Sequence, residues 1–237
     1  MELAIDTSTE TASIALSRRG DVMAEATWNA GQNHTAELAP NIIHLMGQAR
    51  VGFPDLTGIA VATGPGSFSG LRVGMSMAKG LAFALSVPLV GVSTLEAEAF
   101  PHSITGLPVC PMLDAGRGEI ATALFQCRRG RWCRLVDEHI TTIEELLPKV
   151  SGRSVFCGRV TEETARRLRD RLGARARVVS GGAALRRAGY LARLGWTRLE
   201  RGDSDHLPTL QPLYLRKPSI TVSRKARDRA RDGTLLP

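Results

Sequence analysis

The sequence predicts an α/β fold of two related lobes, the second of them reduced. In the first 100 residues, apolar periodicity gives the order three strands, helix, strand, helix, strand, helix. The second half begins with the same order, and the first expected strand of each half ends in an acidic residue, Asp6 or Asp114. This is a duplicated architecture without convincing residue identity between the copies.

The first lobe is expected to open with a three-strand meander, because Gly20-Asp21 is a two-residue turn signal between apolar runs. Apolar residues then recur at helical spacing from Thr35 to Ala49, which predicts an amphipathic helix. The expected elements are strands over 3–6, 12–16, 22–28, 59–62 and 89–92, and helices over 35–49, 69–85 and 94–100.

The second lobe is expected to repeat the meander, with Arg129-Gly130 at its turn. Its expected elements are strands over 109–114, 119–126, 132–139, 155–157 and 178–179, and helices over 142–150, 161–172 and 183–194. We therefore divide the chain into an N-terminal lobe (1–103), a smaller basic lobe (104–218) and a tail (219–237) that we expect to be disordered. The hinge is expected over 101–108, and the stretch 208–218 should be extended.

Composition indicates an ordinary globular chain of 237 residues, 43% of them hydrophobic. The sequence contains neither an apolar run of about 18 residues nor a signal sequence, so we expect a cytoplasmic protein without membrane contact. Its four cysteines contain no CxxC pair, which excludes a zinc knuckle and a thioredoxin motif.

The net charge of +8 is unevenly distributed along the sequence. The first 100 residues carry 5 Lys and Arg against 9 Asp and Glu, and the remainder carries 26 against 14. A polyanion should therefore meet the second half of the chain. The competing interpretation of a run such as Arg166, Arg167 and Arg169 is a solvated helix face.

The glycine-rich stretch ATGPGSFSGLRVG, residues 62–74, resembles a phosphate loop but fits neither common pattern. A Walker loop fails because Gly64 and Gly70 are one residue too far apart and Leu71 replaces the lysine. A dinucleotide loop fails because Ser69 replaces the third glycine. We therefore favour a structural turn capped by Ser67 or Ser69. Arg72 in the first helical turn predicts a negative neighbour, either a carboxylate or a phosphate.

Small residues form an unbroken i, i+4 row on the expected helix 69–85, namely Gly70, Gly74, Ala78 and Ala82. Such a row lets another backbone approach closely. Because this helix is apolar nearly all round, it should be covered on both sides. One cover is its own sheet, and the other is either the helix 35–49 or a helix of a second chain.

Histidine spacing argues against a metal site. His34 and His44 are ten residues apart, roughly 15 Å along a helix, so they cannot share an ion. No G-x-S-x-G elbow supports a Ser-His-Asp set either. We expect no metal and no catalytic residue.

Five stretches together resemble the bacterial TsaB (YeaZ) family: AIDTST at 4–9, NHTAELAP at 33–40, GPGSFSGLRVG at 64–74, MLDAGRGEI at 112–120 and PLYLRKP at 212–218. The resemblance implies the actin-like, sugar-kinase-like (ASKHA) fold. It also implies a noncatalytic partner of the threonylcarbamoyl transferase TsaD, which acts with the ATPase TsaE on adenosine 37 of tRNAs that read ANN codons.

In that family the N-lobe helices pair with those of TsaD, or with a second copy of TsaB when the protein is alone. The implied partner-binding residues are Leu38, Ile42, Leu45, Met46, Gly70, Gly74, Met75, Ala78 and Ala82. The positions that match a degenerate nucleotide or phosphate site are Asp6, Thr7, Ser8, Gly64, Gly66, Ser67, Arg72 and Asp114. Gly116 stands where the family usually has arginine, and Ala121 where it usually has tyrosine, which weakens the nucleotide site.

We therefore expect a scaffold and activator of the tRNA threonylcarbamoyladenosine complex, with ATP or ADP bound only in the assembled complex and tRNA reached through it. The alternative is an ATP-dependent small-molecule kinase or ATPase that uses Asp6. Against it, the only late candidate for a glycine-rich adenosine loop is Gly181-Gly182, and the arginine-rich helix after it is followed by very little sequence to complete the lobe. A third hypothesis is a tRNA-binding module that uses Arg166, Arg167 and Arg169.

Overall fold

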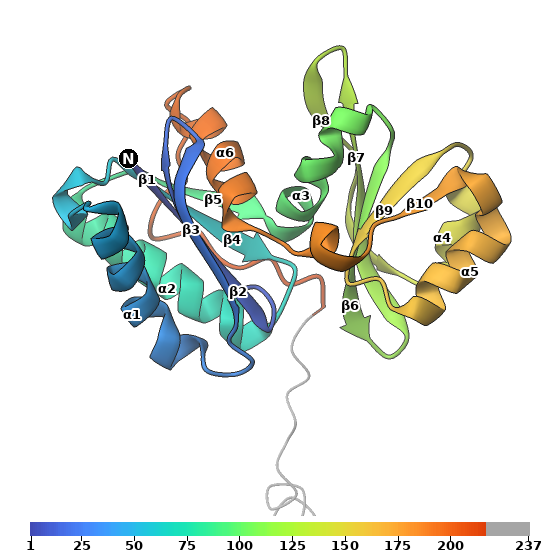
Figure 1. Ribbon diagram of the computed structural model, residues 1–237, viewed down its shortest axis with the longest axis horizontal. Helices are drawn as coiled ribbons and strands as arrows, with labels where there is room; N and C mark the ends of the chain where they lie inside the picture. The colour runs from blue at the N-terminus through green and yellow to red at the C-terminus, as the bar shows by residue number, and fades with distance from the viewer. Residues whose placement is uncertain (217–237) are drawn as a thin grey trace, which may run out of the picture.

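The computed structural model describes residues 1–216 and places them in two lobes side by side, each built on a five-stranded sheet (Figure 1). The strand orders are β3-β2-β1-β4-β5 and β10-β9-β6-β7-β8. Read from the meander outward, the two orders are the same, since β8, β7, β6, β9 and β10 repeat β3, β2, β1, β4 and β5. This confirms the duplicated α/β architecture.

The first sheet combines an antiparallel meander with two parallel strands. Its strands are β1 (Glu2–Asp6), β2 (Thr11–Arg18), β3 (Asp21–Asn29), β4 (Gly58–Gly64) and β5 (Leu89–Ser93). The helices that follow in sequence are α1 (His34–Ala49), α2 (Phe68–Leu85) and α3 (Thr94–Ala99). Because β2 ends at Arg18 and β3 begins at Asp21, the turn residues are Arg19 and Gly20, both with positive φ. The predicted Gly20-Asp21 turn was therefore wrong by one residue.

The second sheet repeats this arrangement with smaller helices. Its strands are β6 (Val109–Gly116), β7 (Glu119–Arg128), β8 (Arg131–Thr141), β9 (Ser154–Gly158) and β10 (Ala176–Val178). Its helices are α4 (Ile143–Leu146) and α5 (Glu162–Leu172), and the last helix of the chain is α6 (Ala188–Leu199). Short 3-10 turns connect elements at η1 (Phe53–Asp55), η2 (Phe100–Thr105), η3 (Leu147–Lys149), η4 (Gly173–Arg175) and η5 (Gly181–Ala184). The predicted turn at Arg129-Gly130 is confirmed.

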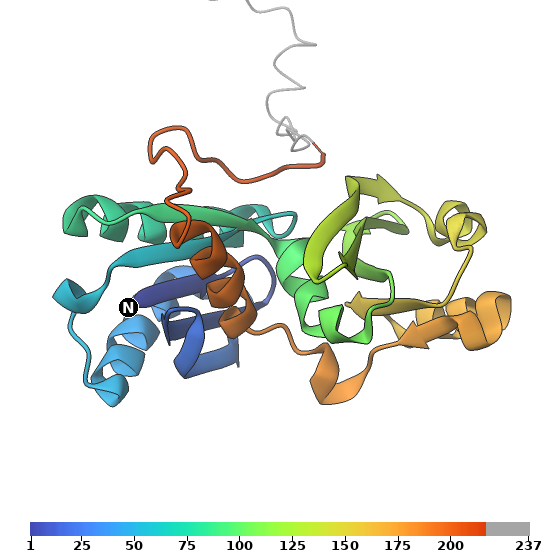
Figure 2. The same cartoon turned by 90° about the horizontal axis from the view of Figure 1, so that it is seen from above.

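The lobes exchange their third helices. α3 packs on the second sheet, where Leu95 and Ala99 join the core formed by β6, β7 and β9. α6 returns to the first sheet, where Ala188, Leu191 and Ala192 pack on β1, β2 and β4. The segment after α6 also lies on the first lobe, because Asp205 N donates to Leu89 O (Figure 2). The sequence had placed residues 104–218 in one lobe, but residues 188–213 contact the other.

The prediction of a last helix over 183–194 was also wrong, because α6 begins five residues later. Arg187 is extended, with φ −129° and ψ 134°, and both it and Arg186 pair with carboxylates of the first lobe. These pairs hold the chain extended where it crosses between lobes, against the helical pattern of the sequence. Residues 207–216 contain neither helix nor strand, and the expected tail (219–237) lies outside the described residues.

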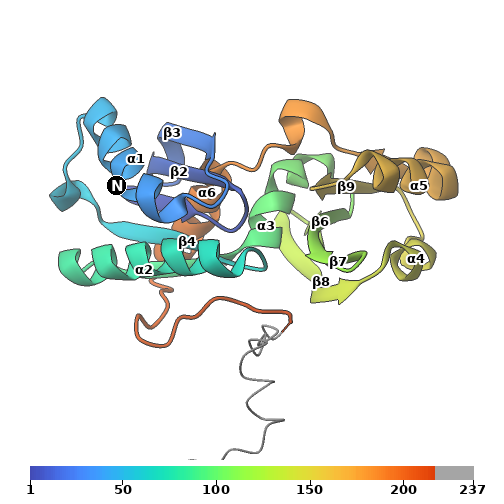
Figure 3. The same cartoon turned by 90° about the horizontal axis from the view of Figure 1, so that it is seen from below.

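The helices α1 and α2 cover one face of the first sheet, and α6 covers the opposite face (Figures 1 and 3). Over residues 1–216, no helix is long and apolar enough to span a bilayer.

Candidate functional site

The hairpin between β1 and β2 and the glycine-rich loop before α2 are packed backbone against backbone. Ser67 N donates to Ser8 O at 2.7 Å, and Thr7 Oγ1 donates to Gly70 O at 2.7 Å. A Cβ at Gly66 would lie 2.1 Å from Ser8 O, and one at Gly70 would lie 2.2 Å from Thr7 O. These glycines are therefore required by the close approach of the hairpin, as the structural-turn interpretation predicts. Ser67 is the helix cap, since its Oγ accepts from Gly70 N.

Asp6, the acidic residue of this hairpin, is fully engaged by protein groups. It is 1% exposed, and its Oδ1 accepts from both Ser8 N and Ser8 Oγ, at 2.9 and 2.6 Å. Its Oδ2 accepts from Arg186 Nε at 2.5 Å. A metal ion or a phosphate-bound water could reach Asp6 only by displacing these partners.

Arg186 lies just before α6 and joins three segments of the chain. Besides Asp6, it pairs with Glu98 of α3 (Nη1 to Oε2, 3.5 Å) and donates to Thr9 Oγ1 at 2.7 Å. Burial raises the pKa of Glu98, and the positive charge of Arg186 opposes that rise. Burial alone would lower the pKa of Arg186, but Asp6 and Glu98 outweigh it and the pKa is raised. We missed Arg186 in the sequence because only the exchange of α6 brings it to Asp6.

The eight predicted phosphate-site residues fall into three groups: four line a cleft, three are buried, and Arg72 lies apart from both. Ser8, Gly66, Ser67 and Asp114 line one interlobe cleft of about 620 Å³, together with Arg159. Asp6, Thr7 and Gly64 are buried behind its wall. Asp114 is exposed and accepts from Gly116 N at 2.8 Å. The structure thus brings four of the eight residues to a common cleft.

Arg72 is directed away from that cleft, toward aromatic groups. Its guanidinium lies 3.8 Å from the centroid of the Phe68 ring, and its Nε donates to the Tyr214 hydroxyl at 3.2 Å. No carboxylate pairs with it among residues 1–216. The prediction of a carboxylate neighbour was therefore wrong, because a cation–π contact takes its place, and the phosphate neighbour stays a prediction.

The nine predicted partner-binding residues are all buried inside the first lobe, so they cannot form a contact surface: Leu38, Ile42, Leu45, Met46, Gly70, Gly74, Met75, Ala78 and Ala82. The row of small residues faces the lobe's own sheet, and a Cβ at Gly74 would lie 2.3 Å from Thr7 Oγ1. The close backbone approach that the row predicted does occur, but the approaching backbone belongs to the same chain.

The opposite sides of α1 and α2 form a different surface, which we call the outer helical face. It consists of Ala36, Pro40, Ile43 and Gly47 on α1 and Ser69, Ser76, Gly80 and Phe83 on α2, all exposed. Ile43 is 61% exposed and Phe83 is 80% exposed, and none of the eight residues is charged. On each helix these residues lie on the side opposite to the core positions, about 180° around the helix axis.

The histidines and the α5 arginines that the sequence singled out form no common site with the residues above. His34 is buried and its Nε2 lies 2.8 Å from Thr9 O, whereas His44 is exposed. Within the described part of the chain, no group of three or more His, Cys, Asp or Glu residues could hold a metal ion. On α5, Arg167 pairs with Glu144 and Arg169 with Glu162, which leaves only Arg166 of the three predicted RNA-binding arginines without an ion pair among residues 1–216.

Comparison with known proteins gives consistent matches. The family model described as TsaD: tRNA N6-adenosine threonylcarbamoyltransferase matches residues 24–165. The protein of Bacillus subtilis named tRNA threonylcarbamoyladenosine biosynthesis protein TsaB is 33% identical over 218 residues, which cover 90% of this chain and 93% of that protein. The protein of the same name from Haemophilus influenzae is 39% identical over 166 residues, covering 65% and 69%.

A transferase is also among the relatives. The tRNA N6-adenosine threonylcarbamoyltransferase of Rhodopseudomonas palustris is 32% identical over 132 residues, which cover 46% of this chain and 36% of that protein.

Solved structures agree in fold. The structure described as YeaZ from Pseudomonas aeruginosa superposes with a TM-score of 0.76 at 27% identity, covering 90% of this chain and 99% of that one. Component A of (R)-2-hydroxyglutaryl-CoA dehydratase from Acidaminococcus fermentans superposes with a TM-score of 0.52 at 12% identity, covering 84% and 98%. The second likeness concerns the fold alone, and together they confirm the predicted ASKHA architecture.

Proposed function

The chain belongs to the TsaB (YeaZ) family, and from this premise we propose that it is the noncatalytic scaffold and activator subunit of the complex that forms N6-threonylcarbamoyladenosine at position 37 of tRNA. Its relatives are named for the biosynthesis of that modification, which supports the pathway. Within it, we propose that the chain binds the transferase TsaD and, with it, the ATPase TsaE.

The outer helical face carries the docking proposal. A monomer that exposes Ile43 and Phe83 on an uncharged face leaves apolar area in water, and such patches commonly mark protein interaction sites. The exposed small residues beside them, such as Gly47, Ser76 and Gly80, allow helices of another protein to approach closely.

The identity of the partner is supported by the chain's own likeness to a transferase. Related subunits commonly pair through equivalent surfaces about a twofold or near-twofold axis. A transferase with the same α/β lobe would present a matching pair of helices. The same surface would let two copies of this chain pair when no transferase is present.

The engagement of Asp6 supports a noncatalytic role. A kinase or ATPase of this fold needs its hairpin acid free to orient a metal ion or a water molecule. Here both oxygens of Asp6 accept hydrogen bonds from protein groups, and Arg186 neutralises its charge. This disfavours the alternative of an independent ATP-dependent kinase or ATPase.

Calorimetric titration of the transferase with the double variant Ile43→Glu, Phe83→Glu tests the docking proposal. Two buried carboxylates at the interface should weaken binding by at least about 100-fold, since truncating interface anchors commonly costs about 2 kcal/mol or more. The matched control is Ile104→Glu, because Ile104 is 91% exposed on η2, away from α1 and α2. The control should bind like the wild type. Wild-type affinity in the double variant would exclude this face as the interface.

A further inference from the structure

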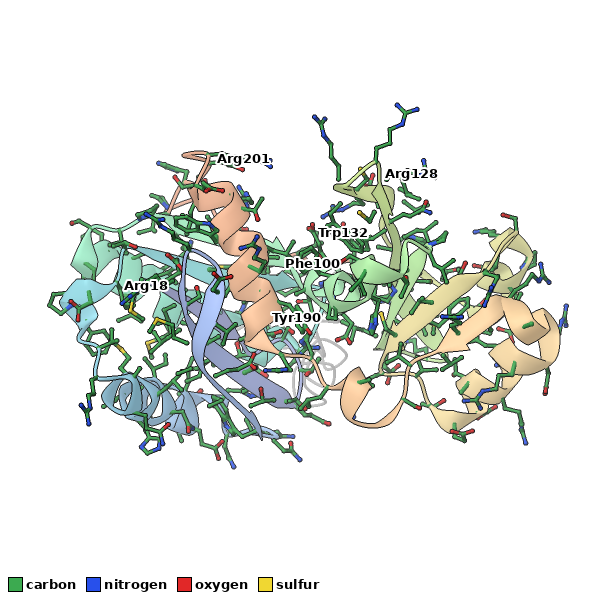
Figure 4. The ribbon with its side chains drawn as sticks, turned by 45° about the horizontal axis from the view of Figure 1, so that its top comes forward. Arg18, Phe100, Arg128, Trp132, Tyr190 and Arg201 are labelled. Carbon is green, nitrogen blue, oxygen red and sulfur yellow. The ribbon has the colours of Figure 1, made fainter. Side chains whose placement is uncertain are left out.

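A second cleft opens between the lobes, separate from the one that holds Asp114. Its volume is about 1100 Å³, larger than the other cleft described above. One wall is α6, and the other is the hairpin formed by β7 and β8. Figure 4 shows Arg201 and Arg128 on opposite sides of its mouth, with Phe100 and Trp132 deeper between them.

Arginines dominate the charged lining of this cleft. α6 contributes Arg193 and Arg198, the turn that follows it contributes Arg201, and the hairpin contributes Arg131 and Arg134. The lining contains only two acidic residues, Glu96 and Glu138. The cleft therefore presents an excess of positive charge from both lobes, and it favours an anionic ligand.

The arginines divide into three engaged and two free ones. Arg193 pairs with Asp21 at 3.7 Å. Arg134 pairs with Glu138 at 2.9 Å and with Glu96 at 3.4 Å. Arg198 pairs with Asp203 at 2.7 Å and with Asp205 at 3.0 Å.

By contrast, Arg131 and Arg201 are exposed and make no ion pair within residues 1–216. The free guanidinium groups thus stand on both walls, and the deeper ones are held in place by carboxylates.

The inner part of the cleft has aromatic and unpaired polar groups. Phe100 and Trp132 meet edge to face, with ring centroids 5.6 Å apart. Trp132 Nε1 and Glu138 Oε1 are the two buried side-chain polar atoms that lack a hydrogen-bond partner within the described residues, and both residues line this cleft. Buried polar atoms are almost always hydrogen-bonded in proteins, so this donor and this acceptor need partners that the described residues do not supply.

We propose that this arginine cleft binds a single-stranded stretch of RNA, with its phosphates at Arg131 and Arg201 and its bases toward the aromatic floor. A positively charged groove with aromatic side chains is the common way to hold a nucleic acid strand. The inference rests on the proposed function, in which the RNA is tRNA.

An acidic protein segment is the competing polyanion, and the wall of the cleft disfavours it. Glu138 Oε1 lacks a hydrogen-bond donor among residues 1–216, and the amino group of a base can supply one whereas the carboxylate of an acidic side chain cannot. None of the five arginines of the cleft belongs to α5, which held the RNA contacts predicted from the sequence. The proposed RNA site therefore differs from the one that the sequence predicted.

Fluorescence anisotropy with a labelled, unmodified tRNA transcript tests the proposal on the full chain. The variant Arg131→Glu, Arg201→Glu should lower the affinity for tRNA at least about tenfold and reduce the dependence of log K on log salt by about 2, one for each lost phosphate contact. The matched control is Arg166→Glu, Arg171→Glu, which reverses two exposed α5 arginines that make no ion pair within residues 1–216. The control should lower the affinity for tRNA by less than about threefold.

Three results would overturn the proposal: no tRNA binding by the wild-type chain at low salt, an equal or larger loss in the α5 control, or competition by polyglutamate as strong as that by polyuridylate. Titration of the same variants with the transferase separates this inference from the proposed function. If the cleft variant and the wild type bind the transferase equally but neither binds RNA, only the RNA proposal fails. If the wild type binds RNA but not the transferase, only the docking proposal fails.

Discussion

Asp6, Arg186 and Glu98 show how a buried cluster can occupy the position of a catalytic acid. All three side chains are less than 9% exposed, and one arginine serves two carboxylates. Removing Arg186 would leave two buried carboxylates without a positive charge between them, and breaking a buried ion pair in this way costs about 3 to 5 kcal/mol. The cluster also ties β1 to α3 and to the segment before α6, so it links the parts of the chain that the lobes exchange.

At this scale, Glu98→Gln should change the pH dependence of stability. Burial raises the pKa of Glu98 above its ordinary 4.5, so the folded state holds this proton more tightly than the unfolded state. Its contribution to stability is therefore complete below pH 4.5 and is lost as the pH rises through the raised pKa.

Glutamine does not titrate, so the variant does not lose stability in this way. Between pH 4.5 and the raised pKa of Glu98, the free energy of unfolding of the variant minus that of the wild type should increase by up to about 1.4 kcal/mol per pH unit. Urea denaturation at several pH values from 4.5 to 7 measures the difference. Parallel pH profiles for the two proteins would show that Glu98 does not titrate in this way.

The helix α2 illustrates what an element's sequence can and cannot specify. Its bounds could be predicted to within one residue, its cap to one of two serines, and its row of small residues in full, because each follows from local periodicity or capping chemistry. Which surface the row faces could not be predicted, since a close-packed sheet and a partner helix demand the same small residues. Gly66, Gly70 and Gly74 face the hairpin of β1 and β2, and only the tertiary structure distinguishes these cases.

Two glycines of α2 provide a matched pair for this point. Gly74→Ala should destabilise the fold by about 1 to 3 kcal/mol, because its Cβ would lie 2.3 Å from Thr7 Oγ1 in a packed core. Gly80→Ala should stabilise it by about 0.5 to 1 kcal/mol, because its Cβ meets nothing within 4 Å and alanine is the better helix former. Thermal and urea unfolding would check both values. Equal effects of the two substitutions would contradict the assignment of the inner and outer faces.

For the whole molecule, the duplicated order of strands and helices along the chain could be predicted from the sequence, but the exchange of α3 and α6 could not. Each lobe's meander and parallel strands follow from alternating and continuous apolar runs. Long-range packing decides which sheet a connecting helix covers, and the apolar residues of α6 would suit either sheet. The interlobe features depend on this exchange, so Arg186 beside Asp6 and the arginine cleft were both beyond reach from the sequence.

The exchange also sets the relative positions of the two proposed surfaces. It directs one face of the first lobe, with α1 and α2, away from the second lobe, and it places α6 opposite the β7 and β8 hairpin (Figure 1). One surface is then uncharged and the other is rich in arginine. A scaffold that joins a protein partner to an RNA would need two such surfaces.

The rate of threonylcarbamoyladenosine formation on tRNA, in a mixture reconstituted with the transferase and the ATPase, tests the central claim most directly. If the chain acts by binding, Asp114→Asn in the interlobe cleft should leave the rate within about twofold of wild type. Ile43→Glu, Phe83→Glu should lower it at least about tenfold at limiting concentrations, with recovery as the concentration of the variant is raised. Loss of the rate with Asp114→Asn and a wild-type rate with the outer-face variant would contradict the account.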